Sequence, residues 1–342
     1  MKHPLITLLL LLIVAVANAQ TYSMMFYNVE NLYDTEKDPV NFDEEFTPQG
    51  AYKWDDKKYW VKIDRLTEVF QKIGETTGGF PILIGLCEVE NRSVLQDLTN
   101  SPRVATAKYQ IVHYDSPDAR GVDVAFLYRN DVIEYVSSKP LRVTNPDDER
   151  WRTRDILWFT GKIDGETFHF FANHWPSRRG GERASAPRRE LAASVLRHVI
   201  DSLQNVDASA KFVVMGDFND DPNNRSVERV LRAKGTTRNM QTGDLFNPMH
   251  AMWRAGLGTL AYNDGWNLFD MILVCQNLIN GDKDRFQLHS PPRSKYQAFI
   301  FNKPFLMQQE GRYKGYPWRM YVGSTYHGGY SDHFPVYIYV SK

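Results

Sequence analysis

KFVVMGDFNDDPNN, residues 211–224, joins a short apolar run to a cluster of acids and amides. Its first five residues predict a buried strand, and Pro222 ends regular structure. Asp217 and Asn219 are two residues apart, so an extended backbone directs both side chains the same way. Such a pair can bind a hard cation, hold a water molecule or contact a phosphate oxygen. Taken alone, the residues fit a plain Asx turn equally well.

Other apolar runs have the same strand character and meet a polar side chain at one end. A carboxylate there costs free energy unless it is paired or binds a cation, which favours a functional role for one of Glu88 and Glu90, with Glu90 as a possible solvated neighbour, and a functional or bracing role for Asp270. For Asn28 a turn former, and for His174 a hydrogen-bonded turn histidine, are the plain alternatives. The predicted strands are residues 22–27 before Asn28, 82–87 before Glu88, 123–128, 168–172 before His174, 266–274 around Asp270, and 336–340 after Asp332 and His333.

Three segments have helical periodicity and alternate with these strands. The first is 57–73, whose apolar positions include Trp60 and which we expect to end at Gly74. The second begins near Ser185 and Pro187 and runs to about Leu203, and the third is 226–233. Residues 276–330 predict loops mixed with short strands. The alternation predicts an α/β fold.

The N-terminal residues 1–19 have the features of a cleavable signal peptide: a positive start, an apolar run and the small-x-small sequence Ala17-Asn18-Ala19. We therefore expect a secreted or periplasmic protein without stable membrane insertion, with residues 20–342 forming a single domain, and we expect a monomer. With 41 Lys and Arg against 41 Asp and Glu, the chain is not coated in basic charge for tight non-specific DNA binding, although a local basic groove remains open. The two cysteines, Cys87 and Cys275, are compatible with a disulfide or with buried free thiols.

An arginine-rich run follows His174 directly: SRRGGERASAPRR, residues 177–189. For such a run a solvated loop is the plain interpretation. Here Gly180-Gly181 allows close approach of the backbone to a ligand, and arginines near a helix start oppose the helix dipole unless an anion lies close. We therefore predict that Arg178 or Arg179 contacts substrate phosphate, with the arginines further along the run, Arg183, Arg188 and Arg189, peripheral.

The ordered set of polar strand ends resembles the endonuclease/exonuclease/phosphatase superfamily, the DNase I-like group, over essentially the whole mature chain. The motifs that carry the resemblance are FYNVEN, LCEVEN, the strand into NHWP, GDFN, WNLFD and SDHFP, in this order. The resemblance implies a four-layer α/β sandwich, with two facing mixed β-sheets flanked by helices and an active site at one edge of the sheets.

The resemblance also implies roles for individual residues. Glu88 is the expected metal-binding glutamate, with Asn28 beside the same metal and Asp332 as a further carboxylate near it. Asp217 and Asn219 are expected to position the attacking water and contact the phosphate, while Asp270 holds His333 by a hydrogen bond. His174 is an expected phosphate contact. An acid that braces this histidine is harder to place, and Asp123 is the nearest candidate.

Carboxylate and amide oxygens suit Mg²⁺, with Mn²⁺ or Ca²⁺ as alternatives. Either Asp217 or His333 can be the group that takes the proton of the attacking water. The sequence contains no Cys/His cluster typical of a structural zinc and no serine-centred elbow typical of an acyl hydrolase.

Three functions are compatible with these residues and with the family resemblance. The first is an exported Mg²⁺-dependent nuclease acting on DNA or RNA. The second is a phosphatase or phosphodiesterase acting on inositol phosphates, sugar phosphates or phospholipid head groups. The third, a binding module without catalysis, fits less well because the polar set is complete.

Overall fold

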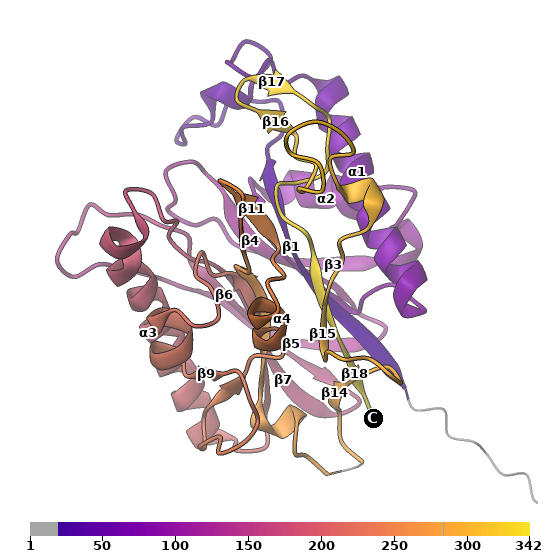
Figure 1. Cartoon of the computed structure of the whole chain (residues 1–342), viewed down its shortest axis with the longest axis vertical. Helices are drawn as coiled ribbons and strands as arrows, with labels where there is room; N and C mark the ends of the chain where they lie inside the picture. The colour runs from indigo at the N-terminus through magenta and orange to yellow at the C-terminus, as the bar shows by residue number, and fades with distance from the viewer. Residues whose placement is uncertain (1–19, 283) are drawn as a thin grey trace, which may run out of the picture.

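The computed structural model describes residues 20–282 and 284–342, so the predicted signal peptide, residues 1–19, lies outside the described residues. Two seven-stranded sheets, each mixing parallel and antiparallel pairs, form the centre of the molecule (Figure 1). The first sheet has the order β14 (Gln287–His289), β18 (Val336–Ser341), β1 (Thr21–Leu32), β2 (Leu83–Val89), β4 (Asp123–Arg129), β3 (Tyr109–His113), with β15 (Ala298–Ile300) also paired to β18. The second has the order β5 (Ile133–Leu141), β6 (Ile156–Ile163), β7 (Glu166–His174), β8 (Lys211–Asp217), β13 (Asp270–Cys275), β10 (Leu245–Phe246), β9 (Ala233–Lys234).

Residue alternation along β1 explains how the first sheet is buried on both faces. Met24 and Phe26 belong to the core that lies between the two sheets, whereas Met25 and Tyr27 belong to a second core on the outer face. All four side chains are fully buried, which accounts for the near-continuous apolar sequence of this strand.

Helices cover the outer faces of both sheets. The helices α1 (Asp56–Thr77) and α2 (Arg92–Asn100) pack on the first sheet through the outer core, and α3 (Glu182–Val206) packs on the second. In Figure 1 these helices lie on opposite sides of the paired sheets. This layering of helix, sheet, sheet and helix confirms the predicted four-layer α/β sandwich.

The end of α1 differs from the prediction. Gly74 is helical and buried against Phe80, and the helix continues to Thr77 before Gly78 adopts a left-handed φ of 82°. Gly78 ends the helix because the left-handed conformation costs glycine little and its N–H bonds back to the Gly74 carbonyl. Trp60, expected on the apolar face, is instead 53% exposed.

Other predicted boundaries also shift. The helix α3 starts at Glu182 and passes through Pro187, whose missing N–H leaves the Arg183 carbonyl without its usual donor four residues along the helix. The predicted helix 226–233 is only a π-helical turn over Ser226–Val230, and Ala233 begins β9. The predicted strand 266–274 is two strands, β12 (Gly265–Asn267) and β13, because the chain leaves its hairpin partner before it joins the second sheet.

Residues 276–330 mix loops with short strands, as predicted. Two hairpins stand outside the sheets: β11 (Leu260–Tyr262) with β12, and β16 (Tyr321–Val322) with β17 (Thr325–Tyr326). The remaining short helices are Glu44–Phe46, Ala105–Ala107, α4 (His250–Arg254), Gln276–Leu278 and Pro304–Leu306.

Cys87 on β2 and Cys275 on β13 belong to different sheets, and both are buried free thiols. The disulfide alternative is therefore not realised. Across the described part of the chain, none of the helices combines the length and the apolar character needed to cross a bilayer.

Candidate active site

Strand register brings the predicted polar residues of the second sheet into one row. His174 at the end of β7 pairs with Asp217 at the end of β8, and Asp217 pairs with Asp270 at the start of β13. Asn28 on β1 of the first sheet reaches this row, since its Nδ2 donates to Asp217 Oδ2 over 3.1 Å. The site therefore spans the junction of the two sheets.

A cavity of about 480 Å³ opens over this junction. Apart from Asp270 and Arg178, it is lined by every site residue predicted from the sequence. These are Asn28, Glu88, His174, Arg179, Asp217, Asn219, Asp332 and His333.

Asp270 lies behind the cavity wall, fully buried, and holds His333. Its Oδ2 is 2.6 Å from His333 Nδ1, which leaves Nε2 directed toward Asp217 Oδ2 at 3.9 Å. Burial by itself lowers the pKa of His333, but the carboxylates of Asp270, Asp332 and Asp217 outweigh it and raise the pKa well above its usual value. The predicted acid–histidine pair is therefore present, with a positively charged imidazole favoured.

Asp217, Asp270 and His333 lie close enough together to ligate a cation. An ion pair explains their proximity better, because Asp270 Oδ2 already accepts a short, charge-assisted bond from His333.

Asp217 is buried and sits in an Asx turn. Its Oδ1 accepts from the backbone N–H of Asn219, whose φ of 50° is left-handed. Burial raises the pKa of Asp217 to about 6, with His333 opposing the rise and Asp270 adding to it. The turn and the functional interpretation are thus compatible, since the turn fixes both side chains at the cavity.

Glu88 is placed by a β-bulge between β2 and its neighbours. The ladder passes from Cys87 to Val89 and leaves Glu88 unpaired with a φ of 63°. A bulge re-aims a side chain, and here the Glu88 carboxylate enters the cavity. Its Oε2 accepts from the Asn31 N–H at 3.0 Å, while Oε1 lies 3.6 Å from the Arg120 guanidinium and 3.7 Å from His174 Nε2.

A divalent cation fits the oxygen atoms beside Glu88. Among the described residues, the cationic groups stay at least 3.6 Å from Glu88 Oε1, Asn28 Oδ1 accepts from the Glu30 N–H, and Asp332 Oδ1 comes no closer than 3.9 Å to His333 Nε2. Carboxylate and amide oxygens with spare lone pairs are the donor set that a hard cation takes.

His174 is buried, with 4% of the residue exposed. Nε2 lies 3.7 Å from Glu88 Oε1 and 3.8 Å from Asp217 Oδ2, and the buried Nδ1 has no hydrogen-bond partner among the described residues. Burial, followed by the charges of Arg154 and Arg120, lowers the pKa of His174 well below its usual value. A neutral imidazole is therefore favoured.

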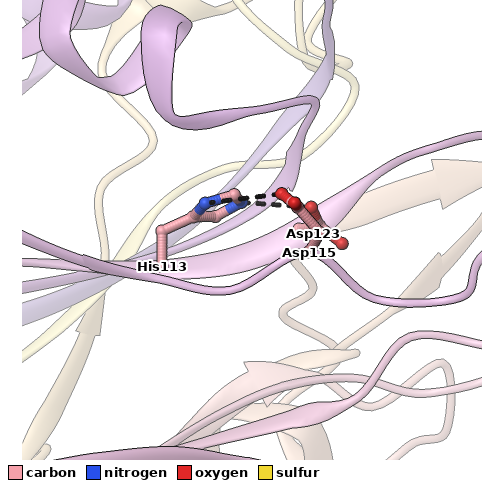
Figure 2. Close-up of side chains that lie close together, drawn as sticks. All are labelled: His113, Asp115 and Asp123. Atoms are coloured by element: carbon pink, nitrogen blue, oxygen red, sulfur yellow. Dashed lines mark hydrogen bonds and ion pairs between the residues drawn. The ribbon is translucent and has the colours of Figure 1, made fainter. Parts of the chain in front are cut away.

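The proposed brace for His174 is wrong. Asp123 instead accepts from His113 Nε2 at 3.1 Å (Figure 2). It also accepts from the N–H and hydroxyl of Ser116. Figure 2 also shows Asp115 beside this pair, 4.0 Å from His113 Nδ1. Asp123 begins β4, and the β3–β4 ladder places the neighbouring His113 within its reach.

The structure places the arginines of residues 177–189 differently from the prediction. Arg178 does not line the cavity, because its guanidinium is bound to the Asn219 carbonyl, Asp220, Asp221, Asn224 and Glu182 and lies over the Phe269 ring. Arg189 is fully buried and pairs with Asp220. Arg179 and Arg188 are both exposed and line the cavity, so Arg188 is not peripheral.

Several cavity residues were not predicted from the sequence. Arg154 donates to Asp118 Oδ2 at 3.1 Å and to the Trp175 carbonyl, and Arg120 lies 3.6 Å from both Asp118 and Glu88. Trp151 and Arg152 complete this wall. The charged run DERWRTRD, residues 148–155, is the signal that could have indicated it.

The sequence comparison places the chain with a known family. The family model described as Endonuclease/Exonuclease/phosphatase family matches residues 23–342. A search among curated protein sequences gives no significant match.

Solved structures share the architecture at low sequence identity, which shows the fold alone. A Bacteroides thetaiotaomicron protein described as of the endonuclease/exonuclease/phosphatase family has a TM-score of 0.56 and 15% identity, covering 95% of this chain and 96% of that one. A mannosyl-6-phosphatase of the same organism has a TM-score of 0.56 and 15% identity, covering 93% and 99%. TDP2 of D. rerio, complexed with single-strand DNA product, has a TM-score of 0.54 and 14% identity, covering 94% and 99%.

Proposed function

This chain belongs to the endonuclease/exonuclease/phosphatase family of metal-dependent phosphoester hydrolases, and we propose that it is a Mg²⁺-dependent nuclease that cleaves DNA or RNA. The reacting phosphodiester would lie in the 480 Å³ cavity, against His174, Asn219 and His333.

The observation that carries this proposal is the pair of unpaired arginines at the cavity. Arg179 and Arg188 are exposed, and among the described residues neither forms an ion pair with a carboxylate. Their neighbours Arg178 and Arg189, by contrast, are held by internal acids. A substrate with phosphates on both sides of the scissile bond offers these two guanidinium groups a partner, and a small phosphomonoester does not.

Asp217 and His333 carry opposite charges at neutral pH, which suits them to different roles at the reaction centre. With its pKa raised to about 6, Asp217 is ionised at neutral pH and basic enough to accept the proton of an attacking water. His333, whose pKa is raised above its usual value beside Asp270, carries a proton and can stabilise negative charge on the phosphate oxygens. We assign the general base to Asp217 on this ground.

Glu88, Asn28 and Asp332 would hold the divalent cation. When bound, such a cation neutralises charge on the non-bridging oxygens and the leaving oxygen. The chain's own contribution is to fix the orientation of these ligands, through the Asn31 N–H on Glu88 and through Arg319, which donates to Asp332 Oδ2 at 2.9 Å.

A second candidate is a phosphatase or phosphodiesterase for sugar or inositol phosphates. The cavity volume, within the roughly 300–1,000 Å³ range of small-molecule sites, favours it. We further propose that the protein is exported, on the strength of the signal-peptide features of residues 1–19.

An activity panel on the purified mature chain tests these proposals. Plasmid DNA, single-stranded DNA, RNA, bis-p-nitrophenyl phosphate and hexose and inositol phosphates would be compared with Mg²⁺ and with EDTA. We expect Mg²⁺-dependent cleavage of a polynucleotide, and the variant Asp217→Asn, purified in parallel, controls for contaminating nucleases. Turnover confined to sugar or inositol phosphates would transfer the assignment to the second candidate.

A further inference from the structure

A second cavity, of about 200 Å³, lies beside the catalytic one and is lined by exposed aromatic rings. Tyr262 and Tyr313 are 71% and 42% exposed, and Tyr316 lies between Tyr313 and Trp266 with ring-centroid distances of 5.6 and 5.7 Å. Large exposed rings gathered at one place on a soluble chain mark a binding site. None of these side chains takes part in the chemistry described above.

The aromatic cavity is fastened to the catalytic residues. Trp266 stacks on Phe334, the residue after His333, with centroids 6.1 Å apart and planes 13° from parallel. The backbone N–H of Phe334 donates to the Thr259 carbonyl, and the Asp270 N–H donates to Thr259 Oγ1. Thr259 is the residue from which the β11–β12 hairpin starts, so the hairpin is held to Asp270 and to the residue that follows His333.

The β11–β12 hairpin fixes the backbone that carries Tyr262, the most exposed of these rings. Asn263 and Asp264 have φ values of 49° and 62°, which is typical of a tight two-residue turn between antiparallel strands. The Tyr316 hydroxyl donates to Asp264 Oδ1 at 2.6 Å, which joins the turn to the segment that carries Tyr313. Tyr313 and Tyr316 are therefore positioned against each other before any ligand arrives, which reduces the entropy lost on binding, while Tyr262 is placed by the backbone of the turn.

Charges beside the rings complement a phosphate chain. Arg319 lines the aromatic cavity, but its guanidinium is already paired with Glu30 at 3.1 Å and with Asp332, a wall residue of the catalytic cavity, at 2.9 Å. Arg312 lies over the Tyr313 ring at 5.7 Å, and neither Arg312 nor Lys314 forms an ion pair with any residue that the structure describes. The amides of Asn263 and Gln308 offer donors and acceptors at the cavity edge.

From this arrangement we propose that the aromatic cavity is a subsite that stacks an unpaired nucleobase next to the scissile phosphate. The inference rests on the proposed nuclease function and narrows it to single-stranded or frayed nucleic acid, because a base inside a duplex cannot present its face to Tyr262 or Tyr313. Tyrosine rings accept any base in this way, so the subsite confers strand selectivity with little sequence preference.

The test uses the double variant Tyr262→Ala/Tyr313→Ala, whose side chains are exposed, so that folding is preserved. Fluorescence anisotropy in EDTA would measure the Kd of a fluorescein-labelled single-stranded oligonucleotide and of the matching duplex without cleavage. We expect the single-strand Kd to rise roughly 10-fold or more and the duplex Kd to change little. Tyr262→Trp/Tyr313→Trp, which keeps the rings, should restore binding, and Trp60→Ala, an exposed aromatic on α1, should leave it unchanged.

Each outcome decides one question. An unchanged single-strand Kd in the double alanine variant, or an equal rise for the duplex, overturns the subsite. Lost affinity for a hexose 6-phosphate with unchanged oligonucleotide binding assigns the rings to a sugar face and also overturns it. Failure of the wild-type protein to cleave any polynucleotide with Mg²⁺ overturns the proposed nuclease function instead, so the two failures are distinguishable.

Discussion

Asn28 on β1 and Asp217 on β8 belong to different sheets, and a hydrogen bond of 3.1 Å from the amide to the carboxylate joins them. Both side chains are almost fully buried, with 2% of each residue exposed. The active site is therefore assembled at the seam between the sheets, and its geometry depends on how closely the sheets pack.

The first prediction concerns the proposed metal ligand. Glu88→Gln should remove most activity at ordinary Mg²⁺ concentrations while the protein stays folded, because it removes the charge of a cavity carboxylate whose Oε1 lies no closer than 3.6 Å to a described cationic group. Turnover measured against Mg²⁺ concentration checks this, with Glu134→Gln on the exposed face of β5 as the control. Wild-type turnover at every concentration would reject Glu88 as a ligand.

The second prediction concerns the pair formed by Asp270 and His333. Asp270→Asn should lower kcat at least about 100-fold with a smaller effect on KM, because the imidazole loses the partner that fixes its orientation and favours its charge. Steady-state kinetics together with the melting temperature separate this from unfolding. A folded variant with wild-type kcat would show that the pair is structural.

The third prediction separates the arginines. Arg179→Ala and Arg188→Ala should each raise KM for a polynucleotide, with little effect on KM for a small diester. Each should also reduce the slope of the logarithm of the polynucleotide binding constant against the logarithm of salt concentration by about one. Arg178→Ala should instead lower the melting temperature, because Asp220 and Asp221 lose a cation that bridges them. The same KM change from all three variants would contradict this division.

The fourth prediction concerns the close approach of β7 and β8. A Cβ at Gly216 would lie 2.5 Å from the Asn173 carbonyl oxygen, so Gly216→Ala must push apart the strands that carry His174 and Asp217. We expect a lower melting temperature and reduced kcat. Gly79→Ala, where a Cβ meets nothing within 4 Å, is the matched control. A Gly216→Ala protein as stable and active as the control would show that the ladder has room.

The fifth prediction concerns pH and stability. Burial lowers the pKa of His169 to about 4, with Asp207 opposing the shift, from an unfolded value of about 6.5. The unfolded chain therefore binds the proton more readily, so this histidine contributes stability above pH 6.5 that is lost as the pH falls from about 6.5 toward 4. His169→Gln keeps an acceptor for Thr160 and should reduce the fall in melting temperature between pH 7.5 and 5.

His198→Gln, on the exposed face of α3, serves as the surface-histidine control for that measurement. If the His169 variant loses as much melting temperature as wild type over the same interval, the buried imidazole is not the source of the pH dependence.

Much of the site could be read from the chain because its chemistry is local. A polar side chain at the end of an apolar strand is visible in sequence, and Asn28, Glu88, His174, Asp217 and Asp270 all have this pattern. The convergence of these strand ends at one edge of the sheets was implied by the family resemblance. The same residues supplied the family resemblance.

Two of the incorrect predictions have the same cause. In each, two residues of the same type were possible, and a contact in the folded structure decides between them. Gly74 and Gly78 are both possible helix ends, and packing of Gly74 against Phe80 decides for Gly78. Asp123 was expected to bind His174, but the pairing of β3 with β4 brings His113 to it instead.

The sequence by itself determined most of the polar strand ends and the α/β class, because these depend on residue type and short-range periodicity, whereas the pairing of Asp270 with His333 was implied by the family resemblance. Only the tertiary structure decided which arginines face the substrate and which rings surround it. Arg178 and Arg179 are adjacent and chemically identical, and they differ only because Asp220 and Asp221 fold back to bind one of them. Trp266 and Phe334 are 68 positions apart in the sequence. Their contact arises from the packing of the hairpin, and no local sequence pattern indicates it.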